Sequence, residues 1–249
     1  MNDHLAEPGG KVRLFVEAPL AQGGRVPATE GQAHYLLHVM RARAGERVSL
    51  FNGRDGEWLA QLTDVTKRGC AFECELQTRP QARTPDLWLC FAPIKKTPAD
   101  YLTQKTTELG VSVLQPVVTR RTVVTRVNVE RMRANAIEAA EQSDRLTVPE
   151  VRAPLPLEKL LSSWPAGRRI LFCDEGGEAP PIAEALRPPS SGPWAVLTGP
   201  EGGFDPAERD AIRASPFVTP VSLGPRILRA DTAALAALAI WQALTGDWR

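Results

Sequence analysis

The architecture of the C-terminal part of the chain is indicated by the stretch from Trp194 to Phe204, which reads WAVLTGPEGGF. It opens with a short apolar run, as expected for a strand buried on both faces of a parallel sheet. The glycines that follow allow the backbone to turn sharply and to approach a ligand closely. In open parallel sheets, ligands bind beyond the carboxyl ends of the strands, so the stretch predicts a binding loop. A plain strand-to-helix turn is the alternative, and the motif is not a Walker loop because no Gly-Lys-Ser/Thr follows.

Outward from this stretch, apolar strands alternate with helices. The other expected strands are Leu87 to Ala92, Val113 to Val118, Ile170 to Cys173 and Val218 to Leu223. Helices are expected after caps at Thr97, Asn128 and Asp205, and a last one from about Thr232 to Leu244. That last segment is apolar nearly all round, so we expect it to be buried. Alternating strands and helices predict an α/β fold with a mainly parallel sheet covered on both faces.

The N-terminal third has a different rhythm. Short strands are expected at Val12 to Val16, Val48 to Phe51, Trp58 to Leu62 and Cys70 to Leu76. Thr29 with Gln32 forms a capping-box pair before one short helix. Strands at this spacing favour a small barrel or sandwich. The polar segment 79–85 carries two prolines, so we predict a domain over 1–79, a linker over 80–85 and a second domain over 86–249.

Charge and composition describe an ordinary globular protein. The 249 residues carry a net charge of +1, which is not the strongly basic footprint of a protein that coats nucleic acid. Residues 93–133 nevertheless hold eight Lys/Arg against three Asp/Glu, and such a local excess can bind phosphates. No apolar run approaches the ~18 residues of a membrane helix, and Met1 to Gly10 lacks the apolar core of a signal peptide. We therefore expect a cytoplasmic protein with no membrane partner.

The four cysteines are interpreted as buried thiols. Cys70 and Cys74 share one face of a strand, where residues four apart lie roughly 13 Å from each other. They can therefore neither pair nor hold one zinc ion, and the three histidines add no ligand spacing. We expect no metal.

A second loop of interest runs from Leu223 to Ala233 and reads LGPRILRADTA. It follows the last strand and leads into the apolar helix. Arg226 and Arg229 beside a buried segment are costly unless they are paired or bind something. Asp231 or Thr232 is also a candidate cap for the helix.

With these two loops in place, the sequence resembles the RsmE-type 16S ribosomal RNA uridine-N3 methyltransferases of the SPOUT superfamily. The resemblance rests on Gly-Pro-Glu-Gly-Gly-Phe followed by Leu-Gly-x-Arg-Ile-Leu-Arg-x-Asp-Thr-Ala. It extends in order to HYLLHVMR (34–41), QKTTELG (104–110) and EAAEQSDR (138–145). Three departures stand out: Asp231 lies where the family often has Glu, Met40 lies where Leu is common, and TRRT (119–122) replaces a more usual Glu-Arg-Ser.

The resemblance implies an N-terminal PUA-like β-barrel that binds RNA and a C-terminal SPOUT α/β domain with a trefoil knot. It implies a homodimer, a ribosomal RNA substrate in the small subunit, and S-adenosylmethionine as the cofactor. The implied cofactor residues are Leu197, Thr198, Gly199, Pro200, Gly202, Gly203, Leu223, Gly224, Ile227 and Leu228.

Candidate catalytic and RNA-binding residues follow from the chemistry. Uridine N3 must lose a proton to become a good nucleophile, so a base or a cation that stabilises the uracil anion would help. Arg229 is the candidate cation, and Asp231 or Glu201 is the candidate for orientation or proton transfer. Expected RNA contacts are Arg41, Arg43, Lys95, Lys96, Arg120, Arg121, Arg126 and Arg145, although each could equally belong to a solvated charged face.

Two other functions are compatible with parts of the sequence. Asp174-Glu175-Gly176-Gly177 after the Ile170 strand could be an acidic ribose-binding turn of an ordinary nucleotide enzyme, although the glycine fingerprint of such enzymes is missing. A non-catalytic RNA-binding protein on the same two-domain scaffold is the second alternative. Binding of S-adenosylmethionine would distinguish the methyltransferase from both.

Overall fold

The structure is a computed structural model that describes residues 12–67, 69–124, 126–176, 179–187 and 192–248. The prediction about a signal peptide at Met1 to Gly10 therefore lies outside the described residues. The chain divides into two compact units. The N-terminal unit comprises residues 1–83 and 140–147, and the C-terminal unit comprises 84–139 and 148–249. Residues 80–86 form neither helix nor strand.

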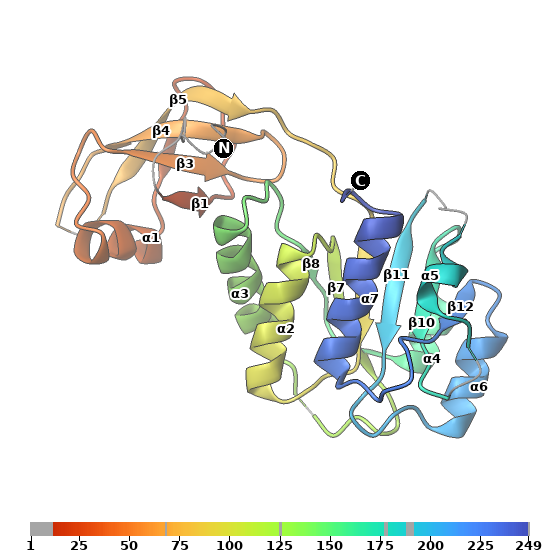
Figure 1. The fold of residues 1–249 in the computed structure, drawn as a ribbon. Coiled ribbons are helices and arrows are strands. Elements are labelled where there is room, and N and C mark those ends of the chain that lie inside the picture. Colours follow the sequence, from red (N-terminus) through yellow and green to blue (C-terminus); the bar gives the residue numbers. More distant parts are fainter. Residues whose placement is uncertain (1–11, 68, 125, 177–178, 188–191, 249) are drawn as a thin grey trace. The chain divides into compact units, whose positions relative to one another are not determined.

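A curled five-stranded sheet forms the N-terminal unit (Figure 1), in the order β1-β3-β4-β5-β2. The strands are β1 (Arg13–Phe15), β2 (Arg25–Pro27), β3 (Arg47–Phe51), β4 (Glu57–Thr63) and β5 (Ala71–Arg79). β1 pairs with β3 in parallel, and the other pairs are antiparallel. Leu14, Leu50, Leu62 and Phe72 are among the apolar side chains buried inside it. The predicted small β-domain is confirmed, and β2 is a strand that the sequence pattern missed.

One short helix accompanies this sheet. Helix α1 (Glu30–His34) begins at the predicted capping box. The backbone N–H of Gln32 donates to Thr29 Oγ1, and the backbone N–H of Thr29 donates to Gln32 Oε1. It continues as a π-helical turn, η2 (Tyr35–Val39). The Gln32 amide also donates to the carbonyl of Phe15 at 2.8 Å, which ties the helix to β1.

One carboxylate of the N-terminal unit, that of Glu57, is buried. The Glu57 carboxylate accepts from Arg13 Nε at 2.7 Å and from Arg79 Nη2 at 2.9 Å. Burial alone would raise the pKa of Glu57, but the bonds from Arg79 and Arg13 outweigh it and hold that pKa below its usual range. Arg13 also donates to the carbonyls of Ala140 and Arg145, at 3.1 and 2.8 Å. The segment 140–147 therefore belongs to the N-terminal unit, which the sequence boundaries did not predict.

The C-terminal unit contains a parallel sheet in the order β12-β10-β11-β6-β7-β8, with β9 also beside β7. Every strand pair described in it is parallel. The strands are β6 (Leu87–Phe91), β7 (Val113–Val118), β8 (Glu150–Val151), β9 (Leu155–Pro156), β10 (Arg169–Cys173), β11 (Trp194–Thr198) and β12 (Val218–Val221). The five predicted strands are confirmed, and the fold class is α/β as expected.

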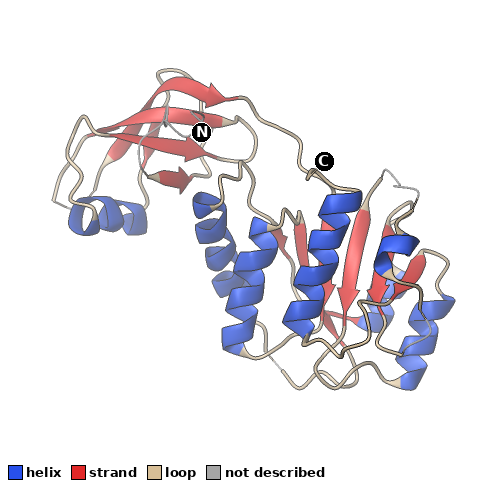
Figure 2. Cartoon of the chain, viewed as in Figure 1, coloured by secondary structure: helices blue, strands red, loops and turns tan. Residues whose placement is uncertain are grey.

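Helices cover both faces of this sheet (Figure 2). They are α2 (Lys96–Glu108), α3 (Val129–Gln142), α4 (Leu157–Ser162), α5 (Ile182–Ala185), α6 (Pro206–Ala214) and α7 (Ala230–Leu244). Residues of α2, α3, α5 and α7 pack on one face with Leu89 and Val196, and residues of α4 and α6 pack on the other with Cys90 and Leu197. The alternation of side chains along each strand creates these two separate cores.

Helix starts agree with the sequence prediction in two of three places. Asp205 and Glu208 form a capping box on α6, and Asn128 Oδ1 accepts from the backbone N–H of Arg131 at the start of α3. The cap predicted at Thr97 is wrong, because α2 already begins at Lys96 with Lys95 as its N-cap. A proline tolerated in the first turn allowed this earlier start.

The last helix returns from the edge of the sheet to its centre. β12 is an edge strand, yet α7 packs over β11 and against α2. Only one face of α7 is buried, with Ala234, Leu238 and Trp241, so the expectation of a helix buried all round is wrong for a single chain. The trefoil knot stays a prediction.

Substitution Glu57→Gln should destabilise the N-terminal unit by about 3 kcal/mol, because it removes the buried counter-charge of Arg13 and Arg79 and leaves them only the exposed carboxylate of Asp144. Urea denaturation at neutral pH measures this. Glu75→Gln is the matched control, since it breaks only the exposed pair with Arg47 and should cost less than about 1 kcal/mol. Equal losses for both variants would contradict the importance of the buried pair.

Candidate ligand site at the carboxyl ends of three strands

Three adjacent strands of the parallel sheet have their carboxyl ends on the same side of the sheet. β10 ends at Cys173, β11 at Thr198 and β12 at Val221. Because the strands are parallel, the chain segments that follow them converge beyond the same edge. They enclose a pocket of about 350 Å³, which falls in the range of small-molecule sites.

The glycine-rich loop forms one wall of the pocket. Gly203 donates its N–H to the carbonyl of Pro200 at 2.9 Å, and its φ of +67° is one that glycine adopts without strain. Phe204 closes the loop, and its ring packs edge-on against Phe172 with centroids 5.3 Å apart. A Cβ on Gly199 would lie only 2.7 Å from this ring. The loop therefore needs glycine at 203 because of its backbone conformation and at 199 because a side chain would collide with the Phe204 ring.

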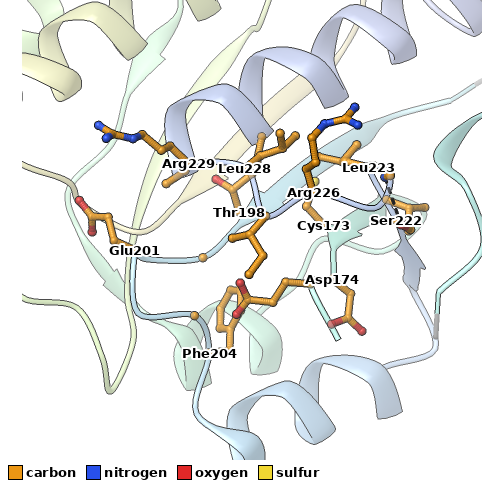
Figure 3. Close-up of a pocket in the computed structure, with 18 of the residues that line it drawn as sticks. Cys173, Asp174, Thr198, Glu201, Phe204, Ser222, Leu223, Arg226, Leu228 and Arg229 are labelled. Carbon is orange, nitrogen blue, oxygen red and sulfur yellow. Dashed lines mark hydrogen bonds between the residues drawn. The ribbon is translucent and has the colours of Figure 1, made fainter. Parts of the chain in front are cut away.

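The second loop forms the opposite wall and leads into α7 (Figure 3). Gly224 has a φ of +104° and donates its N–H to Ser222 Oγ at 3.2 Å. Ile227 is 89% exposed, although it lines the pocket. Arg229 is the N-cap of α7, and its side chain makes no capping bond there. In Figure 3, Glu201 and Arg229 lie toward one end of the pocket.

The turn after β10 contributes an acidic floor. The Asp174 side chain is 1% exposed and lies between Arg209 Nε at 2.7 Å and Arg213 Nε at 2.8 Å. Burial alone would raise the pKa of Asp174, but the Arg209 bond, the Gly176 N–H and the two positive charges hold that pKa below its usual range. Glu175 is exposed and lies against Gly203, where a Cβ would meet its carboxylate.

Eight of the ten predicted cofactor residues line this pocket: Thr198, Gly199, Pro200, Gly203, Leu223, Gly224, Ile227 and Leu228. Leu197 does not, because strand alternation turns it into the core beneath α4 and α6. Gly202 does not line it either. Both loops thus meet around one cavity, as the resemblance implied, while the role of each residue stays a prediction.

Residues that the sequence did not single out as cofactor contacts also line the pocket: Cys173, Asp174, Glu175, Phe204, Val221, Ser222, Pro225, Arg226, Ala230 and Ala233. The signal that could have found the first three was available. Cys173 ends β10 and the other two follow it directly, and the strand-end rule applies to β10 as much as to β11. The sequence did mark Asp174 to Gly177 as a binding turn, of which Gly177 lies outside the described residues.

The predicted catalytic residues separate into two groups. Glu201 and Arg229 line the pocket. Asp231 does not, and its Oδ1 accepts from the backbone N–H of Thr232 at 2.8 Å. The carboxylate of Asp231 therefore already has a bond in the first turn of α7.

The predicted RNA contacts are distributed over both units. Arg41, Arg43, Lys95 and Arg126 are exposed, and the side chain of Lys96 lies outside what the structure describes. Arg145 is half-buried in the N-terminal unit and donates to Thr147 Oγ1. Arg120 and Arg121 are exposed, but each bonds to the segment 202–208. Their contacts to RNA stay predictions.

The described part of the chain also shows how the potential metal ligands and the thiols are placed. The described residues contain no group of three His, Cys, Asp or Glu side chains placed to hold a metal. Cys70, Cys74 and Cys90 are buried and free, and Cys173 is half-buried. Burial raises the pKa of the Cys173 thiol to about 12. Of the helices described, none is long and apolar enough to cross a membrane.

Fold and site define an α/β enzyme scaffold joined to a small β-domain, and comparison with known proteins identifies its class. Residues 81–242 match the profile of a family described as an RNA methyltransferase domain, and residues 28–73 match an RNA methyltransferase PUA domain.

Full-length relatives make the assignment specific. Ribosomal RNA small subunit methyltransferase E of Rickettsia conorii is 31% identical over 91% of this chain and 93% of its own length. The Synechocystis protein of the same name is 34% identical over 93% of this chain and 77% of its own. The crystal structure of the Neisseria gonorrhoeae enzyme, bound to S-adenosyl methionine, is 30% identical with a TM-score of 0.87 and covers 96% of this chain and 99% of that one. This chain belongs to the family of ribosomal RNA small subunit methyltransferase E.

Substitution Asp174→Asn should lower the free energy of unfolding by about 3 kcal/mol at neutral pH, because Arg209 and Arg213 lose their shared counter-charge. The pKa of Asp174 is lowered by folding, so its contribution is complete above the unfolded pKa of about 4 and is lost as the pH falls through the folded value. The stability gap to the wild type should therefore be constant from pH 8 to 5 and narrow below about pH 4. Urea midpoints measured across this range test it.

Asp210→Asn is the control, since Asp210 is an exposed carboxylate on α6, the helix that carries Arg209 and Arg213. It should change stability by less than about 0.5 kcal/mol. A gap for Asp174→Asn that stays constant below pH 4 would contradict the assigned ion pairs.

Proposed function

We propose that this chain is an S-adenosylmethionine-dependent methyltransferase that methylates N3 of a uridine in 16S ribosomal RNA of the small ribosomal subunit. The observation that carries the proposal is the convergence of the loops 199–204 and 222–229 on one pocket at the sheet edge. These loops hold the two motifs that most resemble the family. Family membership and the bound S-adenosyl methionine of the Neisseria gonorrhoeae neighbour support the choice of cofactor.

The residues present fit S-adenosylmethionine. Its adenosine needs apolar contacts and backbone hydrogen bonds, and the pocket offers Leu223, Ile227 and Leu228 beside two glycine-containing loops. Its sulfonium is a cation, and the exposed carboxylates of Glu175 and Glu201 line the same cavity. When bound, this cofactor supplies an electrophilic methyl group.

The chain's own residues would then act on uridine N3. Positioning of N3 near the methyl-donor site comes first, because effective concentration alone supplies a large rate enhancement. The Arg229 guanidinium would stabilise negative charge on the uracil as the N3 proton leaves. Glu201 would orient the base or accept that proton. Asp231 is the weaker candidate, since its carboxylate bonds Thr232 and does not line the pocket.

RNA binding, dimerisation and location complete the proposal. Arg41 and Arg43 on the N-terminal unit and Lys95 and Arg126 on the C-terminal unit are exposed cations suited to phosphates. Leu235, Ala236 and Ala239 of α7 are only partly buried and do not belong to the core cluster, which supports a homodimer in which a second copy covers them. A ribosomal substrate implies that the enzyme works in the cytoplasm.

The nucleotide-enzyme alternative is less well supported. Of the two carboxylates in that turn, Asp174 is buried between two arginines and is not free to accept hydrogen bonds from ribose hydroxyls, and the exposed Glu175 lacks the glycine fingerprint of such enzymes. The non-catalytic alternative predicts RNA binding without cofactor binding. A calorimetric titration separates it from the enzyme.

S-adenosylmethionine should bind the purified protein with micromolar affinity, and Gly199→Ala should weaken binding at least about fivefold. The added methyl group must displace the Phe204 ring, and such overpacking costs about 1–3 kcal/mol. Gly31→Ala is the control, because a Cβ at Gly31 meets no atom within 4 Å. Absence of binding by a folded wild type would contradict the proposed function.

Arg229→Ala should lower the methylation rate by about a hundredfold and leave the affinity for S-adenosylmethionine within about twofold, since it removes a charge that acts on the uracil. The rate is measured on small ribosomal subunits, with N3-methyluridine identified by mass spectrometry of the digested RNA. Glu201→Gln tests the proton-acceptor role in the same assay. A wild-type rate in both variants would remove them from catalysis, and a methyl group found elsewhere on the RNA would correct the target atom.

A further inference from the structure

A short turn after β7 presents two neighbouring arginines to the glycine-rich loop. Thr119 is buried, and its N–H donates to Thr122 Oγ1 at 2.9 Å. The backbone N–H of Thr122 donates to the carbonyl of Thr119 at 3.1 Å, and the hydroxyl oxygens of the two threonines lie 3.0 Å apart. This closed turn determines where Arg120 and Arg121 begin. It lies at the carboxyl end of β7, two strands away from β11.

Arg120 binds the start of helix α6. Its backbone N–H donates to Glu208 Oε1 at 2.9 Å, and its guanidinium donates to Asp205 Oδ1 at 2.8 Å. Asp205 and Glu208 form the capping box of this helix, and Arg120 donates a hydrogen bond to each of these two side chains. Asp205 directly follows Phe204, the last residue of the loop that lines the pocket.

Arg121 binds the loop itself. Its Nη1 donates to the backbone carbonyl of Gly202 at 3.0 Å. Gly202 lies between Glu201 and Gly203, both of which line the pocket. The two arginines therefore hold both ends of the segment 202–205, one through a carbonyl and one through a helix cap.

We propose that Arg121, supported by Arg120, is a positioning residue that holds the glycine-rich loop in the conformation that receives the cofactor. The inference rests on the proposed use of this pocket for S-adenosylmethionine. Gly199, Gly202 and Gly203 carry no side chains to anchor the loop, and ordering each residue costs about 1–2 kcal/mol of backbone entropy. A guanidinium bond to the Gly202 carbonyl offsets part of that cost before the ligand arrives.

This role differs from the RNA contact expected from the sequence. A residue that only binds RNA phosphates would not change cofactor affinity when RNA is absent. A positioning residue changes it in the RNA-free protein. Arg121 uses one of its five donors on Gly202, so a contact to RNA would be additional to this role.

The test is calorimetric titration of S-adenosylmethionine into the full-length, RNA-free protein. Arg121→Ala should raise the dissociation constant about fivefold, the value of one ordinary hydrogen bond. Arg121→Lys, which keeps one charged donor, should return to within about twofold of the wild type. Arg187→Ala is the control, because Arg187 is an exposed arginine of the same unit that does not line the pocket.

Hydrogen exchange of the cofactor-free protein provides a readout that needs no ligand. Amides of 201–205 should exchange faster in Arg121→Ala than in the wild type, with melting temperatures alike. A wild type that binds S-adenosylmethionine and an Arg121→Ala variant that binds equally well would overturn the inference and leave an RNA contact as the role of Arg121. A folded wild type that does not bind S-adenosylmethionine would instead overturn the proposed function.

Discussion

The parallel pairing of β10 with both β11 and β12 is the constraint on which the site depends. Parallel strands have their carboxyl ends on the same side of the sheet, so the ends of β10 at Cys173, β11 at Thr198 and β12 at Val221 come together although they are far apart in sequence. Each of them alone is an ordinary turn. Their convergence forms the cavity, and the return of α7 over β11 adds Ala230 and Ala233 to its lining.

Each unit also contains one buried carboxylate held by two arginines. Glu57 lies between Arg13 and Arg79 in the N-terminal unit, and Asp174 lies between Arg209 and Arg213 in the C-terminal unit. An unpaired buried charge would be prohibitive, whereas a carboxylate with two guanidinium partners satisfies both its charge and its lone pairs. The two arrangements serve different ends. The first binds the segment 140–147 to the small sheet, and the second fixes the floor of the pocket to helix α6.

The pocket combines flexible backbone with fixed surroundings. Glycines leave carbonyl and N–H groups bare for a ligand, but they also leave the loop without anchors of its own. Neighbouring elements provide the anchors: the Phe204 ring on Phe172, the capping box of α6 and the arginines after β7. If the pocket is the proposed methyl-transfer site, these anchors would set its geometry before the ligand binds, which favours specificity. Glu201 and Arg229 line the same pocket with exposed side chains, and under the proposed function they would act on the substrate.

The sequence by itself determined what depends on near neighbours along the chain. Alternating apolar runs predicted the strands, Thr29 with Gln32 and Asp205 with Glu208 predicted helix starts, and the glycine motifs predicted loops that now line one pocket. Tertiary structure decided which strands lie side by side, and hence that Cys173 to Glu175 join the pocket, that Leu197 faces the core and that 140–147 belong to the N-terminal unit. It also gave Arg120 and Arg121 partners within the protein. The reason is physical: periodicity records how a residue is buried relative to its neighbours in sequence, whereas strand order and long-range ion pairs arise from contacts between residues far apart in the chain.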